Sequence, residues 1–234
     1  MKLNKKKVLV VALAVALVAI ISMGTLAWFT DNDTVNNNFM VTDSLTDADA
    51  LFNIDLYETK VNPDGTVVKD AEGNDVIENS GNTYDDILPG DVLAKDPTIK
   101  NTGKYDQWAR VKVTLTKANE WLALFNKYNT DADPDNDIVL ERDLFSGYNG
   151  SVWQSEGNDA PVVVNNTLTF TYYLKDKLSV NETATLFTEV KIPSVFTKED
   201  MVTVNEFELD IVAEAIQYEN TKDTCKAAFE LVGM

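Results

Sequence analysis

The sequence contains no histidine and a single cysteine, Cys225, among its 234 residues. Histidine is the side chain that most often serves as a general base and as a metal ligand. Zinc-protease motifs, Ser-His-Asp triads and Cys-His dyads are therefore excluded, so we expect neither an enzyme nor a zinc-binding protein. One cysteine also excludes a disulfide within the chain, so a hydrophobic core has to supply the stability.

Basic residues are scarce as well. Lysine and arginine number 20 against 38 aspartates and glutamates, which gives a net charge of -18. Four of the lysines precede Val8, and a chain without that basic segment carries 16 basic and 38 acidic residues, or -22. So strong a negative field repels nucleic acid and anionic membrane surfaces, and we expect no nucleic-acid partner.

The sequence has one long hydrophobic run, from Val8 to Met23, and it follows the lysine-rich start of the chain. Thr25 and Ala27 place small residues at positions -3 and -1 of a cleavage site before Trp28. This layout predicts a secretory signal peptide over residues 1–27 and a secreted product, located in the extracellular matrix or at the cell surface. The alternative is an uncleaved anchor, because the run approaches the length that spans a bilayer.

Beyond the hydrophobic run, apolar and polar residues alternate with a period of two. This pattern appears in residues 52–56, 108–116, 167–174, 186–192 and 207–213. In the second stretch we assign Trp108 to the same face as Val111, after an irregularity at Ala109 and Arg110. Alternation of this kind is typical of strands with one buried face, and turn-rich connections favour antiparallel pairing. The sequence therefore predicts an all-β fold, an antiparallel β-sandwich.

Two segments have helical spacing. Residues 118–128 place apolar side chains on one face of an amphipathic helix, and 221–231 form a weaker candidate in which Cys225 is a small core residue or, alternatively, a link between subunits. Turn sequences at 62–65 and 72–75 predict a hairpin extension. We expect one sandwich domain over 47–234, with a helical excursion at 118–160, preceded by a separate segment at 28–46.

An acidic loop invites a calcium interpretation, because Asp131, Asp133, Asp135 and Asp137 occupy every second position. Calcium prefers several carboxylate oxygens from one short loop. The match to a calcium-binding loop is incomplete, since the sixth position is an asparagine and the twelfth is Arg142. A solvated acidic loop is the alternative, and no other cofactor is expected.

A series of short motifs resembles the TasA/camelysin-like family of exported Gram-positive proteins. In chain order these are GTLAWFTD (24–31), LPGD (88–91), IKNTG (99–103), ARVKV (109–113), SVNETATLF (179–187), VKIP (190–193) and AEAIQ (213–217). The resemblance implies a jelly-roll-like sandwich that assembles into biofilm-matrix fibres after cleavage by an ER-type signal peptidase. It also implies a homopolymer and suggests a companion matrix protein. Some family members are described as zinc proteases, a role that this histidine-free chain does not share.

In such a fibre the freed amino-terminal strand of one subunit completes a sheet of the next. The apolar residues that suit a donor segment are Trp28, Phe29, Val35, Phe39 and Val41. Trp28 and Phe29 precede a polar, asparagine-rich stretch, 30–38, and Phe39 and Val41 follow it. That stretch, which contains Val35, can supply main-chain hydrogen bonds to an open sheet edge. The alternative is that this segment folds back as the first strand of its own domain.

Two further classes of function remain open at this point. A monomeric adhesin or binding module would use the acidic loop or exposed aromatic side chains to bind calcium or a glycan. A hydrolase would need a pair of carboxylates, and no pair among the 38 acidic residues has a distinguishing context. The fibre subunit is the leading prediction.

Overall fold

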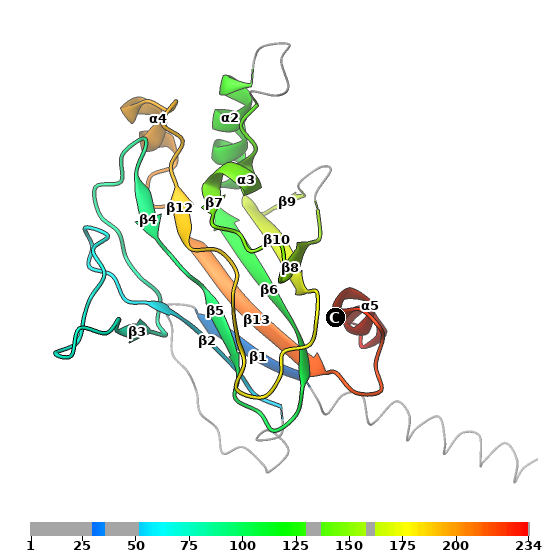
Figure 1. Ribbon diagram of the computed structural model, residues 1–234. Coiled ribbons are helices and arrows are strands. Elements are labelled where there is room, and N and C mark those ends of the chain that lie inside the picture. The colour runs from blue at the N-terminus through cyan, green and yellow to red at the C-terminus, as the bar shows by residue number, and fades with distance from the viewer. Residues whose placement is uncertain (1–29, 36–51, 130–136, 158–161, 234) are drawn as a thin grey trace, which may run out of the picture.

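The structure is a computed structural model that describes residues 30–35, 52–129, 137–157 and 162–233, with only the backbone described for 30–35 (Figure 1). The predicted signal peptide lies outside these ranges. No helix in the described ranges is long and apolar enough to cross a bilayer.

One layer is a six-stranded antiparallel sheet. Its strand order is β1-β13-β6-β10-β8, and β9 pairs with the other end of β10. The strands are β1 (Thr30–Val35), β6 (Gln107–Thr116), β8 (Trp153–Ser155), β9 (Val163–Val164), β10 (Thr167–Leu174) and β13 (Leu209–Gln217). Three of these, β13, β6 and β10, form the long centre of the sheet, and β1 lies at one edge beside β13 (Figure 1).

The second layer consists of two shorter sheets, which lie on either side of a break in one strand pairing. Their orders are β11-β5-β2-β3 and β4-β12-β7. The strands are β2 (Ile54–Thr59), β3 (Ile77–Glu78), β4 (Val92–Ala94), β5 (Thr98–Asn101), β7 (Phe145–Ser146), β11 (Thr183–Thr185) and β12 (Glu189–Lys191). The pair of β4 with β12 continues the register of β5 with β11, and a bond from Lys95 N to Thr188 O (3.2 Å) bridges the gap. Pro97 has no N–H to give to the ladder at this break.

The core lies between the two layers. β6, β10 and β13 bury alternate side chains there, and Ile99 and Phe187 meet them from the opposite layer. Phe145 and Phe187 stack with ring centroids 4.8 Å apart. The structure thus confirms the predicted antiparallel β-sandwich, and it confirms that the apolar positions of β10 share one face.

Trp108 is the exception, and the prediction for its face was wrong. The pairing of β6 with β13 runs without a bulge from Gln107 to Leu115, so alternation is regular. Ala109, not Trp108, therefore faces the sandwich core with Val111. Trp108 lies on the outer face and is buried there by the last helix. At this end of β6 both faces are covered, so apolar residues occur on both faces and the alternation of apolar and polar residues breaks down.

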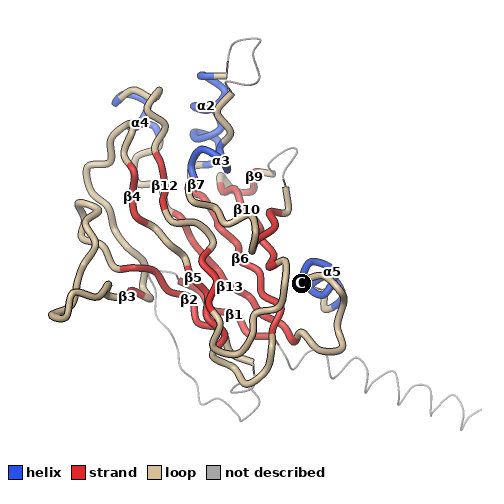
Figure 2. Tube along the Cα trace, viewed as in Figure 1, coloured by secondary structure: helices blue, strands red, loops and turns tan. Residues whose placement is uncertain are grey.

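Four helices occur in the described ranges: α2 (Ala118–Tyr128), α3 (Leu140–Leu144), α4 (Lys198–Thr203) and α5 (Cys225–Leu231). α2 and α5 were predicted, although α5 begins later than the pattern suggested because Thr224 caps it through Ala227 N. α3 and α4 are short helices that the pattern did not reveal. Figure 2 shows α2, α3 and α4 at one end of the sandwich and α5 apart from them.

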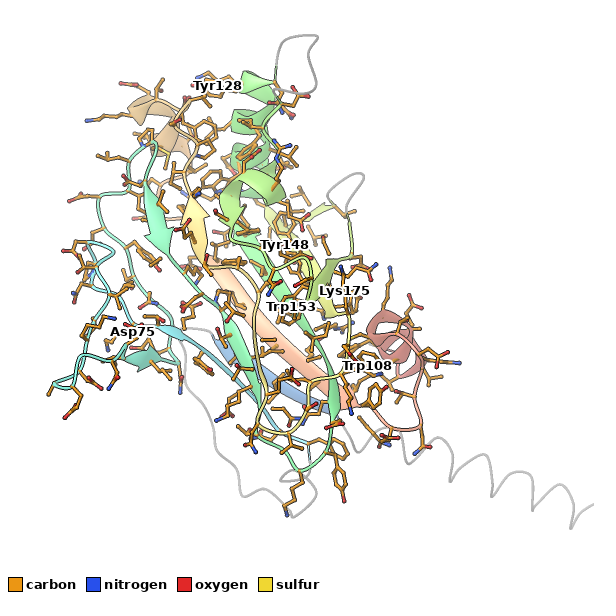
Figure 3. The ribbon with its side chains drawn as sticks, viewed as in Figure 1. Asp75, Trp108, Tyr128, Tyr148, Trp153 and Lys175 are labelled. Atoms are coloured by element: carbon orange, nitrogen blue, oxygen red, sulfur yellow. The ribbon has the colours of Figure 1, made fainter. Side chains whose placement is uncertain are left out.

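The predicted hairpin extension leaves the sandwich between β2 and β3. Gly65 N donates to Asn62 O, which matches the predicted turn at 62–65, whereas Gly73 N donates to Asp70 O, so the second turn lies at 70–73, two residues before the predicted 72–75. Both glycines have positive φ. Between them the chain makes single bridges and no regular strand. Figure 3 places Asp75 on this extension, on the side of the molecule away from Trp108.

Candidate functional site

The edge strand β1 is the part of the predicted assembly segment that the structure describes. It pairs antiparallel with β13, from Thr30 opposite Ile216 to Val35 opposite Ile211. β1 stands at the end of the strand order, so within the described ranges its only strand partner is β13. An edge strand held by one ladder is the kind of element that another copy of the same strand can replace.

The edge of β13 continues beyond β1. Leu209 and Asp210 belong to β13, but the pairing with β1 stops at Ile211. At this point a pocket of about 650 Å³ opens between the start of β13 and β4 of the other layer. Its apolar wall includes Ile87, Leu93, Phe207 and Leu209. The pocket therefore begins where the pairing of β1 with β13 ends.

The polar wall of the pocket is mostly acidic. Glu58, Asp85, Glu206, Glu208 and Asp210 line it, and Lys95 is the only basic residue among the lining residues. Burial and the nearby charge of Glu208 raise the pKa of Asp210. A ligand that carries negative charge would be repelled here, whereas a neutral or basic ligand would not.

Lys95 is already paired inside the pocket. Its Nζ lies 2.6 Å from Glu58 Oε1, and both residues are buried. The other oxygen of Glu58 accepts a hydrogen bond of 3.2 Å from Asn82 Nδ2. Tyr84, whose hydroxyl donates to Ala94 O, has its pKa raised by burial and by the charges of Glu58 and Asp96. The pocket thus has a buried polar floor.

Most of the predicted site residues lie outside the described residues. This holds for the cleavage positions Thr25, Ala27 and Trp28, for the donor residues Phe29, Phe39 and Val41, and for Asp131, Asp133 and Asp135 of the acidic loop. Val35 is described by its backbone and ends β1. Those assignments remain predictions.

Asp137 is the one residue of the acidic loop that the structure describes. Its carbonyl oxygen accepts a hydrogen bond of 2.6 Å from Arg142 Nη2. Among the described residues, no group of three or more aspartate, glutamate or cysteine side chains is arranged to hold a metal ion. The calcium loop gains no support from this part of the chain and stays a prediction.

Comparison with known proteins adds no relative. No protein-family model, no curated protein and no solved structure matches the chain. The function therefore has to be argued from the sequence and the geometry alone.

Sequence reasoning missed the pocket. Glu58 and Lys95 are 37 positions apart, and nothing local marks them as a pair. Glu58 carries the only available signal, since it sits in β2 at a position where alternation after Leu56 calls for an apolar side chain. A charged residue at a core position indicates a buried partner, and that rule would have identified Glu58 but not Lys95.

Proposed function

We propose that this protein is a secreted structural subunit of a biofilm-matrix or cell-surface fibre. After cleavage before Trp28, the amino-terminal strand of one subunit binds the β13 edge of the next. The observation that supports this best is the position of β1, an edge strand paired with β13 alone in the described ranges. The same ladder forms equally well with β1 of its own chain or of a neighbour, because the hydrogen bonds are made by the main chain.

The length of the connection permits an exchange. Sixteen residues, 36–51, separate β1 from the next described part of the chain. Fully extended, such a stretch reaches about 55 Å, which is enough to carry β1 to an adjacent sandwich. Head-to-tail donation of this kind is heterologous and does not close, so it produces a filament.

The chemistry of the pocket suits the residues that follow β1. Residues 34–42 carry no charge, although the chain around them is acidic. A strand that continues the register of Val35 opposite Ile211 would run past Leu209, and Phe39 would come opposite Phe207. We propose that Phe39 of the donor fills the apolar wall, while the neutral asparagines before it avoid repulsion by the five carboxylates.

Competition with a peptide tests the proposal on the mature chain, residues 28–234. Electron microscopy and light scattering should first show fibres. A synthetic peptide of residues 28–41 in excess should then shorten or abolish them, because it occupies the acceptor edge. The matched control is the same peptide with Phe39→Asp, which places a charge against the acidic wall and should leave assembly unchanged.

Two outcomes would contradict the proposal. One is a mature protein that stays monomeric under all conditions tested. The other is a fibre that forms at the same rate in the presence of either peptide, since that result means that β1 remains folded on its own chain and another surface drives assembly.

A further inference from the structure

Three side chains in the floor of the pocket form a connected group. Glu58 comes from β2, Lys95 follows β4, and Asn82 belongs to the loop after β3. One oxygen of Glu58 lies 2.6 Å from Lys95 Nζ and the other lies 3.2 Å from Asn82 Nδ2. Because a single carboxyl group contacts both, an amine and a carboxamide are held as neighbours around it.

The orientation of the Asn82 amide is fixed by its other partners. Its Oδ1 accepts a hydrogen bond from Val61 N (2.9 Å), and its Nδ2 donates to Thr59 O (2.8 Å) as well as to Glu58. An amide rotated by half a turn would face an N–H with its own N–H, so this network assigns the oxygen and the nitrogen. The nitrogen of the amide thus points to the carboxyl group.

The same contacts prepare the amide carbon for attack. The Val61 N–H lies where negative charge develops on Oδ1 if a nucleophile adds to Cγ, which is the arrangement of an oxyanion hole. Glu58 also contacts Lys95 Nζ, and an amine becomes a nucleophile when a neighbouring base removes its proton. Glu58, in hydrogen-bond contact with that amine, is such a base.

The reacting groups are largely shielded from water. Glu58 is 1% exposed and Lys95 is 7% exposed. Water therefore competes little with the Lys95 amine for the Asn82 carbon.

We propose that Lys95 and Asn82 form an intramolecular isopeptide bond, with Glu58 as the proton-transfer group. This is a modification site in the folded chain, and it does not depend on the proposed fibre function. It joins the residue that follows β4 to the loop after β3. In a chain with one cysteine, such a bond supplies the covalent link that a disulfide cannot.

The reaction balances without an oxidant or a co-reactant. A bond forms between Lys95 Nζ and Asn82 Cγ, and the bond between Cγ and Nδ2 breaks. Glu58 takes two protons in turn from Nζ through Oε1 and passes them to Nδ2 through Oε2, so the nitrogen leaves as ammonium. Glu58 ends in the state in which it began, and one positive charge leaves the pocket with the ammonium ion.

Mass spectrometry of the intact, denatured mature protein is the first test. The expected mass is lower than the sequence mass by one molecule of ammonia. Digestion on the amino side of aspartate should then release a branched peptide that joins residues 75–84 to residues 91–95, because Asp75, Asp85, Asp91 and Asp96 set these boundaries. The branched peptide separates the proposed bond from loss of ammonia by cyclisation of an asparagine, which would leave two unlinked peptides.

Variants assign the roles of the residues. Lys95→Arg and Asn82→Ala each remove a bonded group and should restore the full mass, and Glu58→Gln should do so because an amide does not accept the proton. Lys60→Arg is the matched control, since Lys60 pairs with Glu78 at 2.9 Å on the same extension and the other oxygen of Glu78 accepts hydrogen bonds from Ser80 and not from an asparagine amide. It should keep the loss of ammonia.

The proposal is overturned if the wild-type protein has its full sequence mass or if digestion yields residues 75–84 and 91–95 as separate peptides. Both measurements use the unaltered protein, so they decide the matter even if a variant fails to fold. A branched peptide that persists in Glu58→Gln would refute the role of Glu58.

Discussion

Arg110 lies over the ring of Phe229, with its guanidinium carbon 4.3 Å from the ring centroid. The same side chain donates from Nε to Glu214, its cross-strand neighbour on β13. One arginine thus connects the outer face of the six-stranded sheet to α5, which covers Trp108 at the end of that face. The last helix is therefore held by charge as well as by apolar packing.

Removal of the carboxylate should destabilise the fold strongly. Arg110 and Glu214 are both buried, and Lys112 Nζ lies 3.0 Å from the other oxygen of Glu214. Glu214→Ala leaves the arginine without a counter-charge, and we expect the free energy of unfolding in urea to fall by about 3–5 kcal/mol. Asp75→Ala, which breaks the exposed pair with Lys69, is the control and should cost less than about 1 kcal/mol. Similar losses for the two variants would contradict this account.

The packing of α5 gives a second prediction. Phe229 is fully buried against Trp108 and Tyr173, so Phe229→Ala should lower the free energy of unfolding by about 3–5 kcal/mol. It should also shift the tryptophan fluorescence of the folded protein to longer wavelength, because water reaches Trp108. Leu231→Ala on the exposed side of the same helix should change the stability by no more than about 0.5 kcal/mol. An unchanged fluorescence spectrum for Phe229→Ala would show that α5 does not cover Trp108.

Cys225 provides a test of burial in the same cluster. Its sulfur lies 3.1 Å from Ala109 O, and burial raises the pKa of the thiol to about 12. Because the thiolate is the reactive form, a thiol reagent at pH 8 should label the folded protein at least tenfold more slowly than the protein in denaturant. Equal labelling rates would mean that the thiol is exposed, and would revive the alternative in which Cys225 joins two subunits.

The sequence predicted individual strands and helices better than it predicted which of them are in contact. Alternation identified β10 and the helical spacing identified α2, because each pattern reflects a single buried face. Alternation gave the wrong face for Trp108. There α5 buries the second face of β6, so apolar residues on both faces hide the period of two. The pocket could not be predicted from the sequence, because Glu58, Asn82 and Lys95 are distant in sequence and are brought together only by the fold.

Acid should weaken the end of the sandwich where α2 meets α4. Lys127, Tyr128 and the Thr197 N–H all donate to the carboxylate of Asp200, and these bonds hold the pKa of Asp200 well below its usual range. A carboxyl group whose pKa is lower in the folded state stabilises the fold above the unfolded pKa of about 4, and that stabilisation is lost as the pH falls towards the folded pKa.

Urea unfolding between pH 5 and pH 2 measures this contribution. The wild-type stability should fall across that window, and Asp200→Asn should flatten the fall because the amide does not titrate. Lys127→Met removes the largest cause of the lowered pKa and should act in the same direction. If the profiles of Asp200→Asn and the wild type are parallel, Asp200 contributes nothing to the pH dependence.

The proposed isopeptide bond has a mechanical consequence that is separate from its mass. Residues 83–94 lie between the two bonded side chains, so force applied to the ends of an unfolded chain bypasses them. In single-molecule pulling, the fully unfolded wild-type chain should be shorter than the Lys95→Arg chain by up to about 45 Å, the extended length of the bridged segment. Lys60→Arg should match the wild type. Equal lengths for the wild type and Lys95→Arg would mean that the bond is absent, because no non-covalent contact in the pocket survives unfolding to shorten the chain.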